Sequence, residues 1–167
     1  VHPSYGRLGL PTPDDFVGFE DLMMFAMNYD VVTARVVPLL SGPVEGQLAL
    51  SLEEMSSDAT GLVELALRLD GNIGDVKGIS AEFELEGMEF VSARLSDEMS
   101  SPAARTFLWA GDDQIDLAIL GSGVSIGGSG ELARLTFQTT TDECSVDFAS
   151  AALRGVENEL LDAEFEG

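Results

Sequence analysis

Apolar and polar residues alternate along most of the chain from about residue 44 onward. Residues 62–69 (LVELALRL) bring every second side chain to one apolar side of an extended chain, and residues 114–120 (QIDLAIL) repeat the pattern. A period of two is typical of strands that bury one face. The pattern, with turn residues between the segments, predicts nine short strands at 47–51, 62–69, 79–85, 90–95, 105–110, 114–120, 131–139, 145–151 and 160–165.

The segments between these strands indicate the fold class. None of them has the length and periodicity of a helix, and parallel strands need such crossover connections. The sequence therefore predicts an all-β domain over 44–167, an antiparallel β-sandwich or jelly roll of about nine strands. We expect one N-terminal α-helix to pack on it.

The first 43 residues differ in composition from the rest. They hold five of the six prolines, and their one helix candidate is 19–29 (FEDLMMFAMNY). Its apolar arc is far wider than the ~100° stripe of a surface helix, so we expect it to be covered on two sides. Either the following domain or another chain supplies the cover. The side chains expected to dock are Leu22, Met23, Phe25, Ala26 and Tyr29.

Charge limits the possible partners. Asp and Glu total 30 against 8 Lys and Arg, which gives a formal net charge of −22. A nucleic-acid groove or an anionic membrane surface requires clustered basic residues, and the sequence has no such cluster. The longest apolar runs also fall well short of the ~20 residues that span a bilayer. We expect no nucleic-acid partner and no membrane insertion.

Few residues are suited to catalysis. His2 and Cys144 are the single histidine and cysteine, so zinc sites, histidine acid–base catalysis and an internal disulfide are excluded. Cys144 is expected to be a small buried residue near a strand start. Residues 123–127 (GVSIG) match the G-x-S-x-G elbow, but a strand follows and no histidine lies downstream. Ser125 is therefore expected in a flexible inter-strand loop, and we predict no catalytic residue and no cofactor, calcium apart.

Two acidic segments are candidates for calcium. If Asp21 is read as the last position of an EF-hand-type loop, Asp14 falls at position 5 and the carbonyl of Phe16 at position 7. The first two ligand positions lack carboxylates, so only weak binding is predicted there. The turn Asp112-Asp113 is the second candidate, with an ordinary solvated hairpin tip as its alternative.

Trp109 bears on a carbohydrate-binding function. It is the only tryptophan, and it alternates with Phe107 in the segment 105–110, which favours a place in the core. Sugar-binding sandwiches instead require exposed aromatic side chains. A carbohydrate-binding module with a polysaccharide partner stays an alternative that an exposed Trp109 would support.

Two stretches resemble known families. Residues 15–29 (DFVGFEDLMMFAMNY) look like the second half of a dockerin repeat, in which a calcium loop leads into a helix. Residues 45–167 resemble a cohesin domain in the order of their segments. They depart from it at Glu86-Gly87, where cohesins usually carry Tyr-Asp-Pro. The segments that carry the resemblance include 74–85 (GDVKGISAEFEL), 130–137 (GELARLTF) and 151–161 (AALRGVENELL).

The resemblance implies a degenerate dockerin-like extension over 1–43 and a cohesin-like sandwich over 44–167. Cohesins are non-catalytic modules of extracellular assemblies, often for polysaccharide breakdown. The resemblance therefore implies a dockerin-like or other protein module as partner and an extracellular or cell-surface location. A purely structural domain of a larger surface protein, with the helix packed on it, is the remaining alternative.

In the cohesin family the partner docks on the sheet of the third, fifth, sixth and eighth strands. The outward positions of the segments that resemble those strands would then form the partner-binding face. These positions are Glu82, Glu84, Asp116, Ala118, Arg134 and Thr136.

Overall fold

The computed structural model describes residues 18–28, 40, 42, 46–71, 74–100, 105–121 and 124–167. Within this part the chain forms one α-helix and ten strands. They are α1 (Phe19–Asn28), β1 (Ala49–Ser57), β2 (Leu62–Asp70), β3 (Val76–Glu86), β4 (Met88–Leu95), β5 (Thr106–Ala110), β6 (Gln114–Ile119), β7 (Gly130–Thr139), β8 (Ser145–Gly155), β9 (Leu160–Leu161) and β10 (Glu164–Glu166). The predicted all-β class is confirmed, and the last predicted strand divides into β9 and β10.

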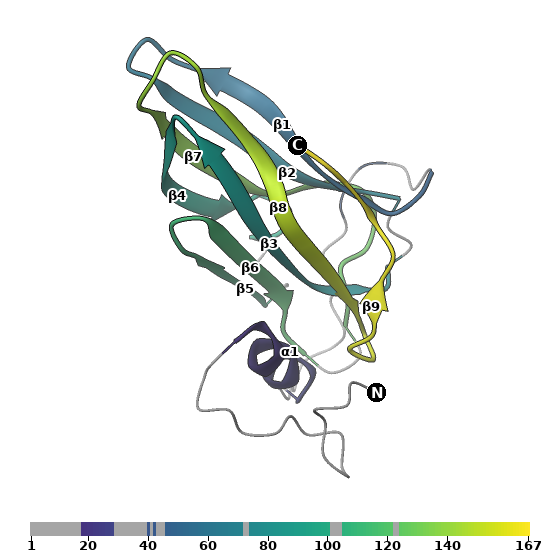
Figure 1. Cartoon of the computed structure of the whole chain (residues 1–167). Coiled ribbons are helices and arrows are strands. Elements are labelled where there is room, and N and C mark those ends of the chain that lie inside the picture. The colour runs from purple at the N-terminus through teal and green to yellow at the C-terminus, as the bar shows by residue number, and fades with distance from the viewer. Residues whose placement is uncertain are drawn as a thin grey trace.

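The strands form two five-stranded sheets that face each other (Figure 1). The first sheet has the order β10-β1-β2-β7-β4, and the second has the order β5-β6-β3-β8-β9. Neighbouring strands are antiparallel, except that β10 pairs with β1 in parallel. Consecutive strands often lie in different sheets, as in the predicted jelly roll.

Alternate residues of the central strands fill the space between the sheets. Leu67 on β2 and Leu135 on β7 face Ile79 and Leu117 of the second sheet in one continuous buried cluster. Phe137 lies among them, with its ring centroid 6.4 Å from that of Phe83 in an edge-on arrangement. Each such buried side chain contributes about 1.5–3 kcal/mol, so the sandwich holds its own core.

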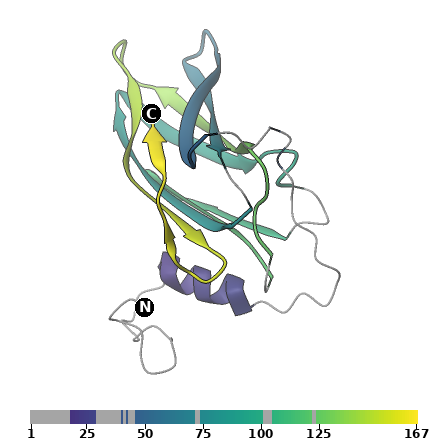
Figure 2. The same ribbon diagram turned by 90° about the vertical axis from the view of Figure 1, so that its right-hand side faces the viewer.

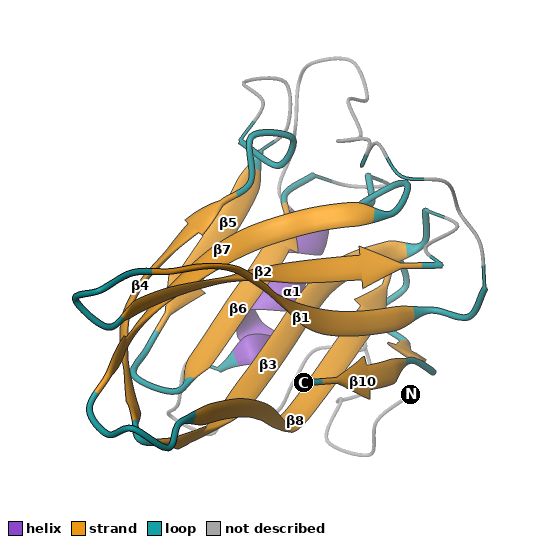
Figure 3. Cartoon of the chain, turned by 90° about the horizontal axis from the view of Figure 1, so that it is seen from above, coloured by secondary structure: helices purple, strands orange, loops and turns teal. Residues whose placement is uncertain are grey.

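Helix α1 forms a third layer outside the second sheet. Seen from above, the first sheet is nearest, the second lies beneath it, and α1 lies beneath that (Figure 3). From the side, α1 runs across the lower end of the sandwich below the turn that joins β8 to β9 (Figure 2). The described part of the chain contains no helix that is long and apolar enough to span a membrane.

The glycine-rich loop before β7 is anchored to the sandwich over its described part. The backbone N–H of Ile126 donates to the carbonyl of Val76 over 2.6 Å, and Ile126 itself is fully buried. The Lys77 ammonium donates to the carbonyls of Gly121 and Val124. The expectation of a flexible loop therefore does not fit residues 121 and 124–130.

Candidate functional site

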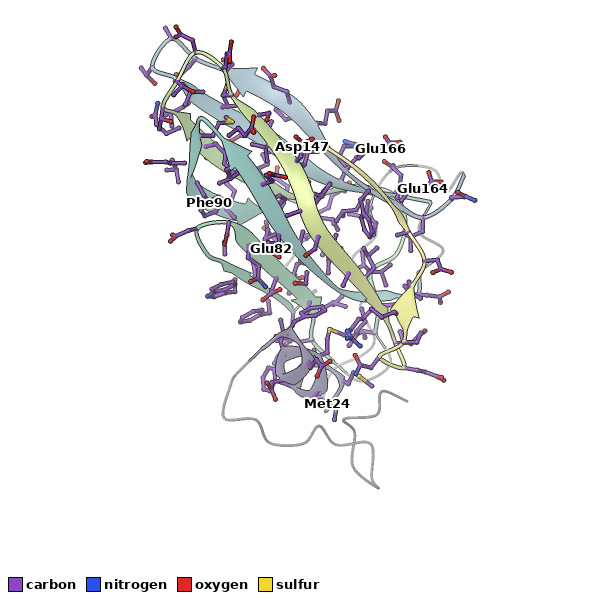
Figure 4. The ribbon with its side chains drawn as sticks, viewed as in Figure 1. Met24, Glu82, Phe90, Asp147, Glu164 and Glu166 are labelled. Atoms are coloured by element: carbon purple, nitrogen blue, oxygen red, sulfur yellow. The ribbon has the colours of Figure 1, made fainter. Side chains whose placement is uncertain are left out.

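The outer face of the second sheet carries acidic side chains on three neighbouring strands. On β3, Glu82 and Glu84 are exposed because Ala81, Phe83 and Leu85 take the inward positions. The register places Glu84 directly opposite Asp147 of β8; Figure 4 labels Glu82 and Asp147 on these two strands. Asp116 of β6 lies on the same side. We call Glu82, Glu84, Asp116 and Asp147 the acidic face.

No described arginine or lysine forms an ion pair with a residue of the acidic face. The Ser150 hydroxyl donates to Glu82 over 3.2 Å, and the Gln114 amide donates to Asp116 over 3.2 Å. Asp116 keeps only 9% of its surface exposed. Among the described residues, the hydrogen-bond partners of Glu82 and Asp116 are thus neutral side chains.

The outer face of the first sheet is different, because three of its acids, Glu53, Glu64 and Glu131, are ion-paired. Glu64 of β2 contacts Arg94 at 3.4 Å and Arg134 at 3.3 Å. Glu131 holds Arg134 at 2.6 Å, and this hydrogen bond raises the pKa of the guanidinium above its usual range. Three of the described arginines, Arg68, Arg94 and Arg134, lie on this sheet and are each ion-paired. Unpaired acids remain on both sheets, but among the described residues ion pairs between strands of one sheet are found only in the first, so the acidic face is not compensated by its own sheet.

The predicted partner-binding face is wrong in two of its members. Arg134 and Thr136 lie on β7, which pairs with β2 and β4 in the first sheet. In the second sheet β3 lies between β6 and β8, whereas β7 belongs to the first sheet. The residues that belong to the face in their place, and that sequence analysis missed, are Asp147 and Ser150. Glu82, Glu84, Asp116 and Ala118 do share one outer face.

Trp109 is exposed, which corrects its predicted place in the core. Its relative exposure is 47%, and the register sets it opposite Asp116 on the outer face. Leu108 takes the inward position of β5. The strand is apolar on both sides, so alternation alone could not decide which side faces inward.

Of the five predicted docking residues of the helix, Met23 and Ala26 are fully buried. Leu22 is partly buried in the same cluster, together with Ala118 of β6. Phe25 is 54% exposed, so its predicted burial is wrong. At 100° per residue it projects on the side of the helix opposite Met23. Tyr29 lies outside the described residues.

Helix α1 is oriented by polar contacts at both ends. The N–H of Gly18 donates to the Asp21 carboxylate over 2.9 Å, which caps the first turn as in a capping box. Arg154 of β8 lies 3.6 Å from Glu20. The carbonyl of Ala26 accepts the N–H of Gly121 over 3.1 Å.

The structure leaves calcium binding as a prediction. Asp14 and Phe16 lie outside the described residues, and Asp21 is occupied as the helix cap. Asp112 and Asp113 are exposed in the turn between β5 and β6. Among the described residues, no three potential metal ligands lie together.

Three further residues, Cys144, Ser125 and His2, were weighed for chemistry from the sequence. Cys144 is exposed in the loop before β8, so its predicted burial is wrong; its neighbours in this loop are also exposed, because the loop lies outside both sheets. The Ser125 hydroxyl donates to the carbonyl of Gly74. His2, the one histidine, lies outside the described residues.

Comparison with known proteins shows which solved structures this fold resembles. No family model matches the sequence, and no curated protein matches it either. Among solved structures, a non-cellulosomal cohesin from Archaeoglobus fulgidus is 12% identical with a TM-score of 0.56, over 72% of this chain and 87% of its own. The sixth cohesin of a scaffoldin from Acetivibrio cellulolyticus, solved with a dockerin, is 14% identical with a TM-score of 0.57, over 72% and 94%.

A cohesin–dockerin complex from Clostridium thermocellum gives a third match, at 12% identity and a TM-score of 0.56, over 80% of this chain and 93% of that chain. At such low identity these likenesses concern the fold alone. They agree with the β-sandwich fold described above. The chain therefore has a cohesin-like fold.

Proposed function

We propose that this chain is a non-catalytic protein-interaction module that binds a helical, dockerin-like protein module on the outer face of the second sheet. The observation that carries the proposal is the acidic face, whose four carboxylates have no cationic partner among the described residues. The cohesin-like fold supports it, since two of the similar cohesins were solved with dockerins.

The acidic face indicates the chemistry of the partner. Like charges directly opposite on neighbouring strands, such as Glu84 and Asp147, destabilise the pairing. A partner that brings lysines or arginines to this surface would relieve that repulsion and gain a faster association. We therefore expect the partner to present a basic helix.

Titration against a panel of dockerin modules with basic recognition helices tests the proposal. The double variant Glu82→Lys/Asp147→Lys should weaken binding at least about tenfold, because it places like charges against the partner. The matched control is Glu54→Lys/Glu89→Lys, which makes the same charge change at exposed acids of the first sheet. The control should bind like the original chain.

Equal weakening by both double variants would show that only net charge matters and would contradict a specific face. Binding that survives Glu82→Lys/Asp147→Lys would place the partner elsewhere. The absence of saturable binding to every module of the panel would count against a dockerin-like partner.

The proposal extends to the organisation of the chain. Residues 44–167 form the interaction module, and residues 1–43 form a dockerin-like extension that supplies α1. By analogy with the cohesins it resembles, the module works outside the cell or at its surface, in an assembly that displays or joins secreted proteins. A link to polysaccharide breakdown belongs to the same proposal.

Carbohydrate binding is a second candidate because Trp109 is exposed. Its ring packs over Gly111, whose added Cβ would lie 2.8 Å from the indole, so the ring is held across the end of β5. Trp109→Ala should abolish retention on insoluble polysaccharide if this candidate is right. If the original chain is not retained on the polysaccharide, carbohydrate binding is excluded.

A further inference from the structure

Helix α1 occupies a depression in the outer face of the second sheet. Gly78 of β3 and Ala118 of β6 are register partners, so two adjacent outward positions carry little or no side chain. Met23 and Ala26 fill the space and are fully buried, and a Cβ added to Gly78 would overlap the sulfur of Met23. We call Gly78, Ala118 and Arg154 the helix seat.

The seat also has polar contacts for an incoming helix. Arg154 is 13% exposed and lies 3.6 Å from Glu20 in the first turn of α1. Its guanidinium carbon lies 5.9 Å from the centre of the Phe19 ring. Glu20 and Phe19 in the first turn of α1 thus contact Arg154, while Met23 and Ala26 enter the depression.

The polar fit of α1 is incomplete. The Nε atom of Arg154 is buried and has no hydrogen-bond partner among the described residues. Glu20 stays 40% exposed and is no closer than 3.6 Å. A buried charged group with an unsatisfied donor makes docking less favourable. Helix α1 therefore does not use all the hydrogen-bonding capacity of Arg154.

The helix depends on the seat for its own structure. It has 10 residues, fewer than the ~12–15 at which isolated helices become marginally stable in water. When α1 leaves the seat, it therefore loses its helical structure as well. Docking and helix formation are coupled, as in segments that fold upon binding.

We propose that the helix seat is a peptide-binding site whose resident α1 is exchangeable, and that the α1 segment of a second copy of the chain is the occupant it fits. In the resting molecule the chain's own α1 blocks this part of the outer face. The inference rests on the proposed function in one respect: the outer face of the second sheet is the binding face.

A fluorescent peptide with the sequence of residues 14–31 tests the exchange in trans. The full chain should not bind it at micromolar concentration, because a tethered segment competes at an effective concentration on the order of millimolar. The variant Met23→Asp/Ala26→Asp should release its own helix and then bind the peptide with saturation. About 1 M salt, where the screening length is about 3 Å, suppresses repulsion between the acidic peptide and chain.

Met55→Asp is the matched control, since Met55 is an exposed methionine of β1 in the first sheet. It should behave like the original chain. Hydrogen exchange follows α1 in every variant, and its protection should be lost only in Met23→Asp/Ala26→Asp. A peptide that carries the same two substitutions should bind none of the proteins.

Three results overturn the inference. The first is peptide binding that is equal in the original chain and in Met23→Asp/Ala26→Asp, since α1 would then not compete. The second is a released variant that fails to bind the peptide. The third is a Met23→Asp/Ala26→Asp variant whose α1 stays protected from hydrogen exchange despite its two added carboxylates. If no dockerin binds but the released variant binds the peptide, only the proposed function is overturned. If a dockerin binds but the released variant does not bind the peptide, only this inference is overturned.

Discussion

Lys77 is the single lysine of the chain, and it is 1% exposed. Its ammonium donates to the carbonyls of Gly121 and Val124 at the start of the glycine-rich loop. Burial disfavours the charged form and lowers the pKa of Lys77 from 10.5 to about 8. The hydrogen bonds of Lys77 thus anchor the loop, whereas burial of its charge lowers the stability of the folded chain.

The Lys77 pKa predicts a pH dependence. Below pH 8 the lysine is charged in both states, and the burial cost is complete. Between about 8 and 10.5 the unfolded chain binds more protons than the folded chain, so the free energy of unfolding rises with pH. We expect a gain of about 2 kcal/mol from pH 7.5 to 9.5, since each unit of pKa difference corresponds to 1.36 kcal/mol.

Urea unfolding at a series of pH values measures this gain. The variant Lys77→Met keeps a similar volume and removes the titrating group, so its stability should not rise over the window. Cys144 and the two tyrosines are common to both proteins and cancel in the comparison. A rise of the same size in Lys77→Met would assign the pH dependence to another group.

At the scale of elements, the contact between α1 and β3 includes the close approach of Met23 to Gly78. Gly78→Ala should cost about 1–3 kcal/mol by overpacking against Met23. In a Met23→Ala background the added methyl has room, and the same change should cost less than about 0.5 kcal/mol. The coupling between the two sites is what a double-mutant cycle isolates.

Denaturant unfolding of the four proteins in the cycle measures the coupling. Met55→Ala replaces Met23→Ala in the control cycle and should leave the cost of Gly78→Ala unchanged. Additive effects in the first cycle would mean that Met23 does not fill the space above Gly78. The carbonyl of Leu117, 3.3 Å from the added Cβ, contributes equally in both cycles.

At the scale of the whole molecule, the net charge of −22 opposes the compact state through self-repulsion. The described arginines of the first sheet neutralise part of it locally, but the acidic face has no such compensation. Raising sodium chloride from about 0.05 to about 1 M should therefore raise the melting temperature by several degrees, because the screening length falls to about 3 Å.

Two controls identify the cause of a salt effect. The variant Glu82→Gln/Asp147→Gln removes two negative charges from the acidic face and should reduce the rise. Calcium and a chelator compared at equal ionic strength separate screening from specific binding, since a bound ion would raise stability further. A melting temperature that is independent of salt, or that falls, would contradict the repulsion argument.

The sequence by itself determined the strands, the all-β class and the helix, because these follow from periodicities within a few neighbouring residues. The alternation of 62–69 and 114–120 needs only local geometry to predict a strand with one buried face. The end of β1 was missed, since residues 53–57 pair with β2 but are exposed and show no such alternation.

Only the tertiary structure decided which strands are neighbours and which faces they share. β7 and β8 both read as strands, but their places in different sheets moved Arg134 and Thr136 off the candidate face and brought Asp147 onto it. The burial of Lys77 and the exposure of Trp109 and Phe25 likewise depend on contacts between distant segments. Periodicity gives the repeat of a pattern but not the partner that covers each side, and that partner is set by packing across the whole molecule.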